Sequence, residues 1–201
     1  MTLKSEIVVV SGLPRSGTSL MVQMLDQGGL SVLTDQQRTA DVDNPRGYYE
    51  FELVKRMKSD TSWLPEARGK VVKVVSALLY DLPVGEQYRI VFMQRDLDEV
   101  IASQEKMLER RGRPIPPREK VKAAFELHLE RLFEWLGRQP HMPLLTVSYN
   151  DLMSDARRQS QRVCEFLDGA FDGALDADHM LAAIDPALYR NRAAAHNSAS
   201  S

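Results

Sequence analysis

The fold is decided by residues 7–20, which read Ile-Val-Val-Val-Ser-Gly-Leu-Pro-Arg-Ser-Gly-Thr-Ser-Leu. The β-branched run predicts a buried strand, the glycine-containing stretch predicts a tight loop, and the apolar-periodic segment from Thr18 predicts a helix. Free N–H groups and the positive end of a helix dipole meet in such a loop, which favours a phosphate group. The spacing of Gly12 and Gly17 is that of a P-loop, but Thr18 replaces the Walker A lysine and the loop's cation is Arg15.

The composition limits the class of protein. The chain has 201 residues, a formal net charge of −2 and one cysteine. This length supports one core, so we expect a single domain over residues 1–192 and a flexible tail over residues 193–201. The charge gives no reason to expect nucleic acid as a partner. One cysteine, no apolar run of membrane-spanning length and no signal-peptide pattern together predict a cytoplasmic protein.

Strand-like and helical segments alternate along the chain. Strands are expected over 5–11, 70–75, 89–94 and 143–148, with a weaker signal over 30–33, and helices over 18–27, 96–110, 118–137, 155–167 and 176–184. Several strands are apolar throughout, which is typical of strands buried on both faces. The pattern predicts a three-layer α/β fold with a mainly parallel central sheet, whose ligands bind at the carboxyl ends of the strands.

A second candidate anion site follows the strand expected over 89–94. Arg95 stands at the carboxyl end of that strand, on the same edge as the first loop. Ser103 lies eight residues later, about two helical turns, so its hydroxyl can face the same side. An arginine at a strand end is common by itself. Together with the first loop, however, it predicts two separate anion sites on one sheet edge.

These motifs resemble those of sulfotransferases that use 3′-phosphoadenosine 5′-phosphosulfate (PAPS). The family has a loop of the form Pro-[Lys/Arg]-x-Gly-Thr-[Ser/Thr] after its first strand, which residues 14–19 match, and a later arginine and serine at the spacing of Arg95 and Ser103. Residues 44–50 resemble a segment of bacterial relatives. Residues 147–152 are similar to a family segment, Tyr-Glu-Asp-Leu, whose tyrosine lies near the adenine. The resemblance extends from residue 7 to about residue 167 and implies the topology of P-loop nucleoside triphosphate hydrolases.

The resemblance also implies a reaction and a set of site residues. The reaction is in-line transfer of a sulfuryl group from PAPS to a hydroxyl or amine of a small-molecule, glycan or lipid acceptor, with no metal needed. Arg15 and Lys73 would neutralise charge on the phosphosulfate and the leaving phosphate. The residues implied to bind the donor are Pro14, Arg15, Ser16, Gly17, Thr18, Ser19, Arg95, Ser103 and Tyr149. The oligomeric state stays open.

The chain departs from the family at the general base. Val75 stands where cytosolic members have a histidine, and Asn150 replaces the usual glutamate of the later segment. Other branches use a carboxylate as the base, so Glu50 is our first candidate and Glu52 our second. Both acids are also compatible with an exposed helix start, where they favour the dipole. We expect His128 to be a buried, hydrogen-bonded residue.

Two other functions fit part of the pattern. A P-loop kinase or NTPase would share the fold class, but it lacks support because Thr18 replaces the lysine and Gln94-Arg95 stands where an aspartate for magnesium is expected. A non-catalytic nucleotide-binding relative is compatible with Val75. The acceptor wall could draw on Tyr48, Tyr49, Phe51, Trp63 and Met107, which fit an ordinary core equally well.

Overall fold

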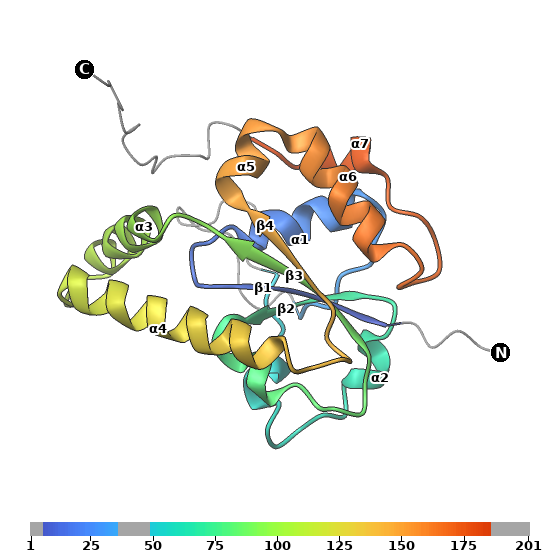
Figure 1. The fold of residues 1–201 in the computed structure, drawn as a ribbon, viewed down its shortest axis with the longest axis horizontal. Helices are drawn as coiled ribbons and strands as arrows, with labels where there is room; N and C mark the ends of the chain where they lie inside the picture. The colour runs from blue at the N-terminus through green and yellow to red at the C-terminus, as the bar shows by residue number, and fades with distance from the viewer. Residues whose placement is uncertain (1–5, 36–48, 186–201) are drawn as a thin grey trace.

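The computed structural model describes residues 6–35 and 49–185, and it has a central sheet of four parallel strands (Figure 1). The sheet order is β2-β1-β3-β4, with β1 at Ile7–Gly12, β2 at Val71–Val75, β3 at Tyr88–Gln94 and β4 at Leu144–Ser148. The four strongest predicted strands are therefore confirmed. The segment expected over 30–33 contributes only an isolated bridge from Val32 to Val71.

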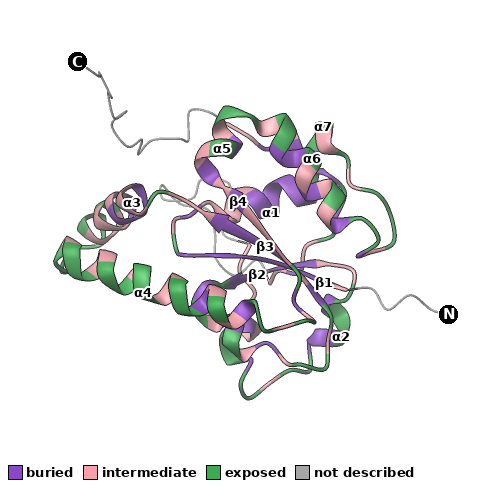
Figure 2. Cartoon of the chain, viewed as in Figure 1, coloured by how far each residue is buried: buried purple, intermediate pink, exposed green. Residues whose placement is uncertain are grey.

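Helices cover both faces of the sheet. One face packs against α1 (Thr18–Gln27), α5 (Tyr149–Ser154), α6 (Ala156–Leu167) and α7 (Ala177–Leu181). The other packs against α2 (Leu64–Ala67), α4 (Arg118–Leu136) and the 3₁₀ helices η1 (Glu52–Arg56) and η2 (Ser76–Asp81). Burial is concentrated in the strands and in the helix sides that face them (Figure 2). The predicted three-layer α/β fold is confirmed.

The register of the sheet brings the chemistry-bearing segments to one edge. Gly12 at the end of β1 pairs with Val75 of β2 on one side and with Met93 of β3 on the other. Gln94 pairs with Ser148, so β4 ends at the same level. Because all four strands are parallel, the loop after β1, the start of η2, Arg95 and Tyr149 meet at the carboxyl edge.

Several short helices were not predicted from the sequence. The elements η1, α2, η2 and α5 have four to six residues each, which is too short for a periodic apolar pattern to identify. Helix α5 is delimited by side-chain caps, because Ser148 Oγ accepts from the Asp151 amide at 3.1 Å. None of the helices within residues 6–35 and 49–185 combines the length and hydropathy that crossing a membrane requires.

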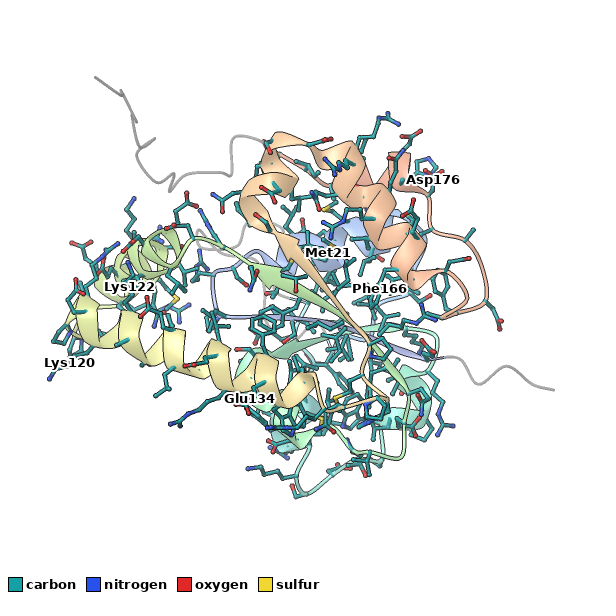
Figure 3. All side chains as sticks on the ribbon, in the orientation of Figure 1. Met21, Lys120, Lys122, Glu134, Phe166 and Asp176 are labelled. Carbon is teal, nitrogen blue, oxygen red and sulfur yellow. The ribbon has the colours of Figure 1, made fainter. Side chains whose placement is uncertain are left out.

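Helix α3 (Leu97–Arg110) pairs with α4 in a helical arm that extends beyond the carboxyl edge of the sheet (Figure 1). Asp98 of α3 accepts from Lys122 at 2.8 Å and from Arg118 at 3.2 Å. These two hydrogen bonds hold the pKa of the Asp98 carboxyl below its usual value. Figure 3 shows Lys122 on the side of α4 toward α3 and Lys120 on the outer side. The pairing orients α3, which carries several residues of the candidate site.

The anchoring of α4 gives a test of this packing. Leu132 of α4 has no exposed surface and packs in the core below the sheet, whereas Leu127 of the same helix is 45% exposed. We expect Leu132→Ala to lower the free energy of unfolding by about 2–5 kcal/mol in urea denaturation. Leu127→Ala is the matched control and should stay within about 0.5 kcal/mol of the wild type. Equal effects of the two changes would contradict the packing.

Candidate functional site

The loop between β1 and α1 has the backbone of a built anion site. Arg15 adopts a left-handed conformation with φ 73°, and Gly17 follows with φ 99°. Ser16 Oγ donates to the Leu13 carbonyl at 2.7 Å and fixes the turn. Helix α1 has Gly17 at its N-cap with no side-chain capping bond, so Thr18 and Ser19 do not cap it. The uncapped amides of the first turn therefore face the loop, where they can bind an anion.

Tyr149 packs directly on this loop. A Cβ atom on Gly17 would lie 3.0 Å from Tyr149 Cε2 and closer still to Cδ2, so only glycine fits beneath the ring. The Arg95 guanidinium carbon lies 4.5 Å from the centroid of the same ring. A cation at this distance is attracted by the ring face. The buried tyrosine thus contacts both predicted anion-binding segments.

Arg95 belongs to a buried ion pair. Its Nε donates to Glu99 Oε2 at 2.8 Å, and the side chains of Arg95 and Glu99 are only 8% and 2% exposed. The second Glu99 oxygen accepts from Asn150 Nδ2 at 3.2 Å. Arg95 Nη1 also approaches the Arg15 carbonyl at 3.4 Å. The end of β3 is therefore tied both to α3 and to the loop after β1.

The two predicted anion sites touch each other. Arg15 Nε donates to Ser103 Oγ at 3.0 Å, although the two residues lie 88 positions apart in the chain. Ser103 is buried on the first two turns of α3, as its spacing from Arg95 predicts. The two predicted sites therefore adjoin each other at the carboxyl edge of the sheet.

Lys73 and Glu50 border the same region on the α1 side. Lys73 Nζ donates to Ser19 Oγ at 3.2 Å and lies 3.9 Å from Glu50 Oε1. Tyr49, immediately before Glu50, is with Arg15 one of two non-glycine residues with positive φ among the described residues. Strained backbone of this kind is concentrated at functional sites. Glu52 begins η1 and pairs with Lys55 at 2.7 Å, and the same Lys55 Nζ lies 3.9 Å from Glu50 Oε2, so Glu50 stands between Lys73 and Lys55.

His128 lies near the position of the missing family histidine. Val75 ends β2 and is 40% exposed, and the next residue, Ser76, has its Oγ 2.9 Å from His128 Nε2. His128 is half-buried, and burial lowers the pKa of its imidazole. The predicted hydrogen bond is confirmed by this contact, whereas the predicted full burial is not, because the imidazole is only partly covered. Because α4 brings His128 to β2 from 52 positions away, no local sequence pattern could reveal the pairing.

A cavity of about 340 Å³ adjoins the loop on the side of α4. Six of its eleven lining residues are apolar, and Arg95 and Ser16 are among the polar ones. The lining residues are Leu13, Ser16, Phe92, Met93, Gln94, Arg95, Asp96, Leu97, Val100, Leu129 and Ser148. It is therefore built from the loop, the ends of β3 and β4, α3 and α4, and its lining includes none of the five residues suggested for an acceptor wall.

The residues suggested for an acceptor wall do not lie together as one group. Phe51 and Trp63 pack edge to face with ring centroids 5.5 Å apart, and they belong to the core below the sheet, so the alternative of ordinary core holds for this pair. Tyr48 and the rest of the 44–48 segment lie outside the described residues, as does the tail expected over 193–201. Within residues 6–35 and 49–185, no group of three or more histidine, cysteine or acidic side chains is arranged to hold a metal.

Comparison with known proteins agrees with this geometry. Residues 77–173 match the model of a sulfotransferase family. This stretch of the chain is similar to sulfotransferases. The matched range holds Arg95, Ser103 and Tyr149, whereas the loop around Arg15 lies before it. A search of curated proteins found no match.

Solved structures of sulfotransferases share the fold. A sulfotransferase domain from the Synechococcus PCC 7002 olefin synthase superposes with a TM-score of 0.55 at 16% identity, covering 92% of this chain and 80% of that one. A sulfotransferase domain from the curacin biosynthetic pathway superposes with a TM-score of 0.53 at 16% identity, covering 90% of this chain and 78% of that one. A sulfotransferase from Alicyclobacillus acidocaldarius superposes with a TM-score of 0.50 at 14% identity, covering 86% of this chain and 84% of that one. At these identities the likeness concerns the fold.

The contact between Gly17 and Tyr149 can be tested with a matched pair of glycines. Gly29 also has a left-handed backbone, with φ 103°, but a Cβ there would meet nothing within 4 Å. Gly29→Ala should therefore cost only the backbone strain, about 1–2 kcal/mol of unfolding free energy. Gly17→Ala should cost about 1–3 kcal/mol more, because the new methyl group overlaps the Tyr149 ring. Equal costs in chemical denaturation would show that Tyr149 does not pack on the loop.

Proposed function

We propose that this chain is a sulfotransferase that transfers a sulfuryl group from PAPS to a hydroxyl or amine acceptor. The observation that carries the proposal is the contiguous arrangement of Arg15, Ser103 and Arg95, linked by the 3.0 Å bond from Arg15 to Ser103. A donor with a 5′-phosphosulfate and a 3′-phosphate needs cations and hydroxyls at two neighbouring positions. Charge-assisted hydrogen bonds from arginine are well suited to such groups.

In this proposal the chain's own cations do the neutralising. The reaction breaks the bond between the sulfur and the bridging phosphate oxygen and forms a bond from the sulfur to the acceptor oxygen or nitrogen. Arg15 and the first amides of α1 would stabilise the charge that develops on the leaving phosphate. Lys73, held against Ser19, stands beside the same position. Pro14, Ser16, Gly17 and Thr18 would shape the loop around the 5′ group.

The acceptor's proton needs a base, and Glu50 is our candidate. Its carboxylate lies 3.9 Å from Lys73 Nζ and is 27% exposed, so it can meet both the transfer site and an incoming acceptor. A general base has to come within about 3 Å of the proton it removes, directly or through one water. Tyr149 would lie near the adenine of the donor, on the loop side of the site.

The donor can be tested by ligand-induced stabilisation. We expect 3′,5′-adenosine bisphosphate without Mg²⁺ to raise the melting temperature by roughly 5–10 °C at about a hundredfold excess over its Kd. ADP with Mg²⁺ should do much less, because it lacks the 3′-phosphate and the loop lacks the Walker lysine. Differential scanning fluorimetry measures both. The reverse order would favour the P-loop kinase or NTPase and contradict the proposal.

The base can be tested by comparing two neighbouring carboxylates. Glu50→Gln should lower turnover by about 10²- to 10⁴-fold, because the amide cannot take the acceptor's proton. Glu52→Gln is the matched control and should leave turnover near the wild-type value, since that side chain is 44% exposed and its partner Lys55 keeps Glu50 as a second partner. The measurement is release of 3′,5′-adenosine bisphosphate from PAPS with a mixed panel of phenols, alcohols and amines. Similar turnover of the two variants would remove Glu50 from the mechanism.

A further inference from the structure

Glu99 is a buried acid in the middle of the proposed donor site. Its side chain is 2% exposed, and it lies one helical turn after Arg95. An acid at this place would ordinarily oppose the binding of a phosphate. Burying a charge is also costly unless the charge is paired and hydrogen-bonded. A buried carboxylate beside a proposed phosphate site therefore needs a structural explanation.

We propose that Glu99 is a positioning residue that fixes the Arg95 guanidinium and thereby gives the site its preference for a ligand with a 3′-phosphate. The inference rests on the proposed PAPS-type donor. It goes beyond that proposal because it assigns the preference for a 3′-phosphate to Glu99, a residue that need not touch the ligand. Asn150, on the other side of the carboxylate, has the supporting role.

The geometry of Arg95 shows how the positioning works. Glu99 takes the Nε hydrogen at 2.8 Å, on one side of the planar guanidinium. The Tyr149 ring lies against its face, 4.5 Å from the centroid. Nη1 then points toward the loop, as its 3.4 Å approach to the Arg15 carbonyl shows. The guanidinium is thus oriented before any ligand arrives, which lowers the entropy lost on binding.

The Glu99 carboxylate is also held in place, because each of its two oxygens accepts a hydrogen bond. One Glu99 oxygen accepts from Arg95 and the other from the Asn150 amide at 3.2 Å. The backbone amide of Glu99 is itself capped by Asp96 Oδ1 at 3.1 Å, which fixes the first turn of α3. An amide at position 150 can donate to Glu99, whereas the glutamate usual in the family segment would bring a second negative charge to a buried carboxylate. The departure at Asn150 therefore suits the chain's own Glu99.

Two consequences separate this role from simple electrostatics. If Glu99 only neutralised part of the positive charge of Arg95, removing the Glu99 charge would strengthen the binding of a 3′-phosphate. If Glu99 orients Arg95, removing its charge frees the guanidinium to rotate and weakens that binding. The 5′ part of the site should respond less in either case, because Ser16 holds the turn through the Leu13 carbonyl, a bond that does not involve Glu99.

The test is the ratio of two dissociation constants, for 5′-AMP and for 3′,5′-adenosine bisphosphate, measured by isothermal titration calorimetry on the full chain. Glu99→Gln should lower this ratio about tenfold or more, since charge-assisted hydrogen bonds are the strong ones. The affinity for 5′-AMP should change less than about threefold, because no bond to the 5′ group is altered. Asn150→Ala keeps the Glu99 charge but removes the amide that donates to it and the long 3.5 Å bond that Asn150 Oδ1 accepts from the Asp96 amide, so a smaller fall in the ratio is expected.

Controls make each outcome decisive. Glu105→Gln removes an acid that also lies on α3 and also pairs with an arginine, Arg118 at 2.9 Å, and it should leave the ratio unchanged. Asn150→Ala decides the matter if Glu99→Gln does not fold, because Asn150 is only partly buried. An unchanged or increased ratio in the folded variants would overturn the role of Glu99. A wild-type protein without preference for the bisphosphate would instead defeat the PAPS proposal, and the inference with it.

Discussion

The buried ion pair between Arg95 and Glu99 is the interaction on which the carboxyl edge of the sheet depends. It joins the end of β3 to the first turn of α3, and through the stacked Tyr149 ring it supports the loop at Gly17. The same guanidinium approaches the Arg15 carbonyl, where the backbone is left-handed. One pair of side chains therefore connects the loop after β1 with α3 and α5. A buried pair of this kind stabilises little by itself, but removing one partner is expensive.

Cations in this site stand in different places from those of a Walker A loop. The loop's charge is on Arg15, inside the turn, and a second charge comes from Lys73 on the neighbouring strand. Both are held by hydroxyls, of Ser103 and Ser19, so the two cations lie in fixed positions around the uncapped start of α1. Such an arrangement can neutralise a leaving phosphate through the protein alone. Glu50 beside Lys73 adds an acid at the point where an acceptor would approach.

The sequence was sufficient for the regular elements and for the loop. Apolar runs and helical stripes identified β1 to β4, the four longest helices (α1, α3, α4 and α6) and the position of the short α7, because burial on a regular element leaves a periodic pattern. The relation between Arg95 and Ser103 also followed from helical geometry. Contacts between distant segments did not follow: the bond from Arg15 to Ser103 spans 88 positions and depends on a strained turn, and the pairing of Ser76 with His128 depends on how α4 crosses the sheet. Glu99 was overlooked because an acid in the first helical turn is usually a surface residue.

The most direct test of this account is a crystal structure of the chain with 3′,5′-adenosine bisphosphate. The account predicts that the 3′-phosphate lies within hydrogen-bond distance of Arg95 and Ser103, and that Arg15 leaves Ser103 to contact the 5′-phosphate. It also predicts that Glu99 keeps its bond to Arg95 Nε. A complex in which Arg15 still donates to Ser103, with both phosphates bound away from Arg95, would contradict the account.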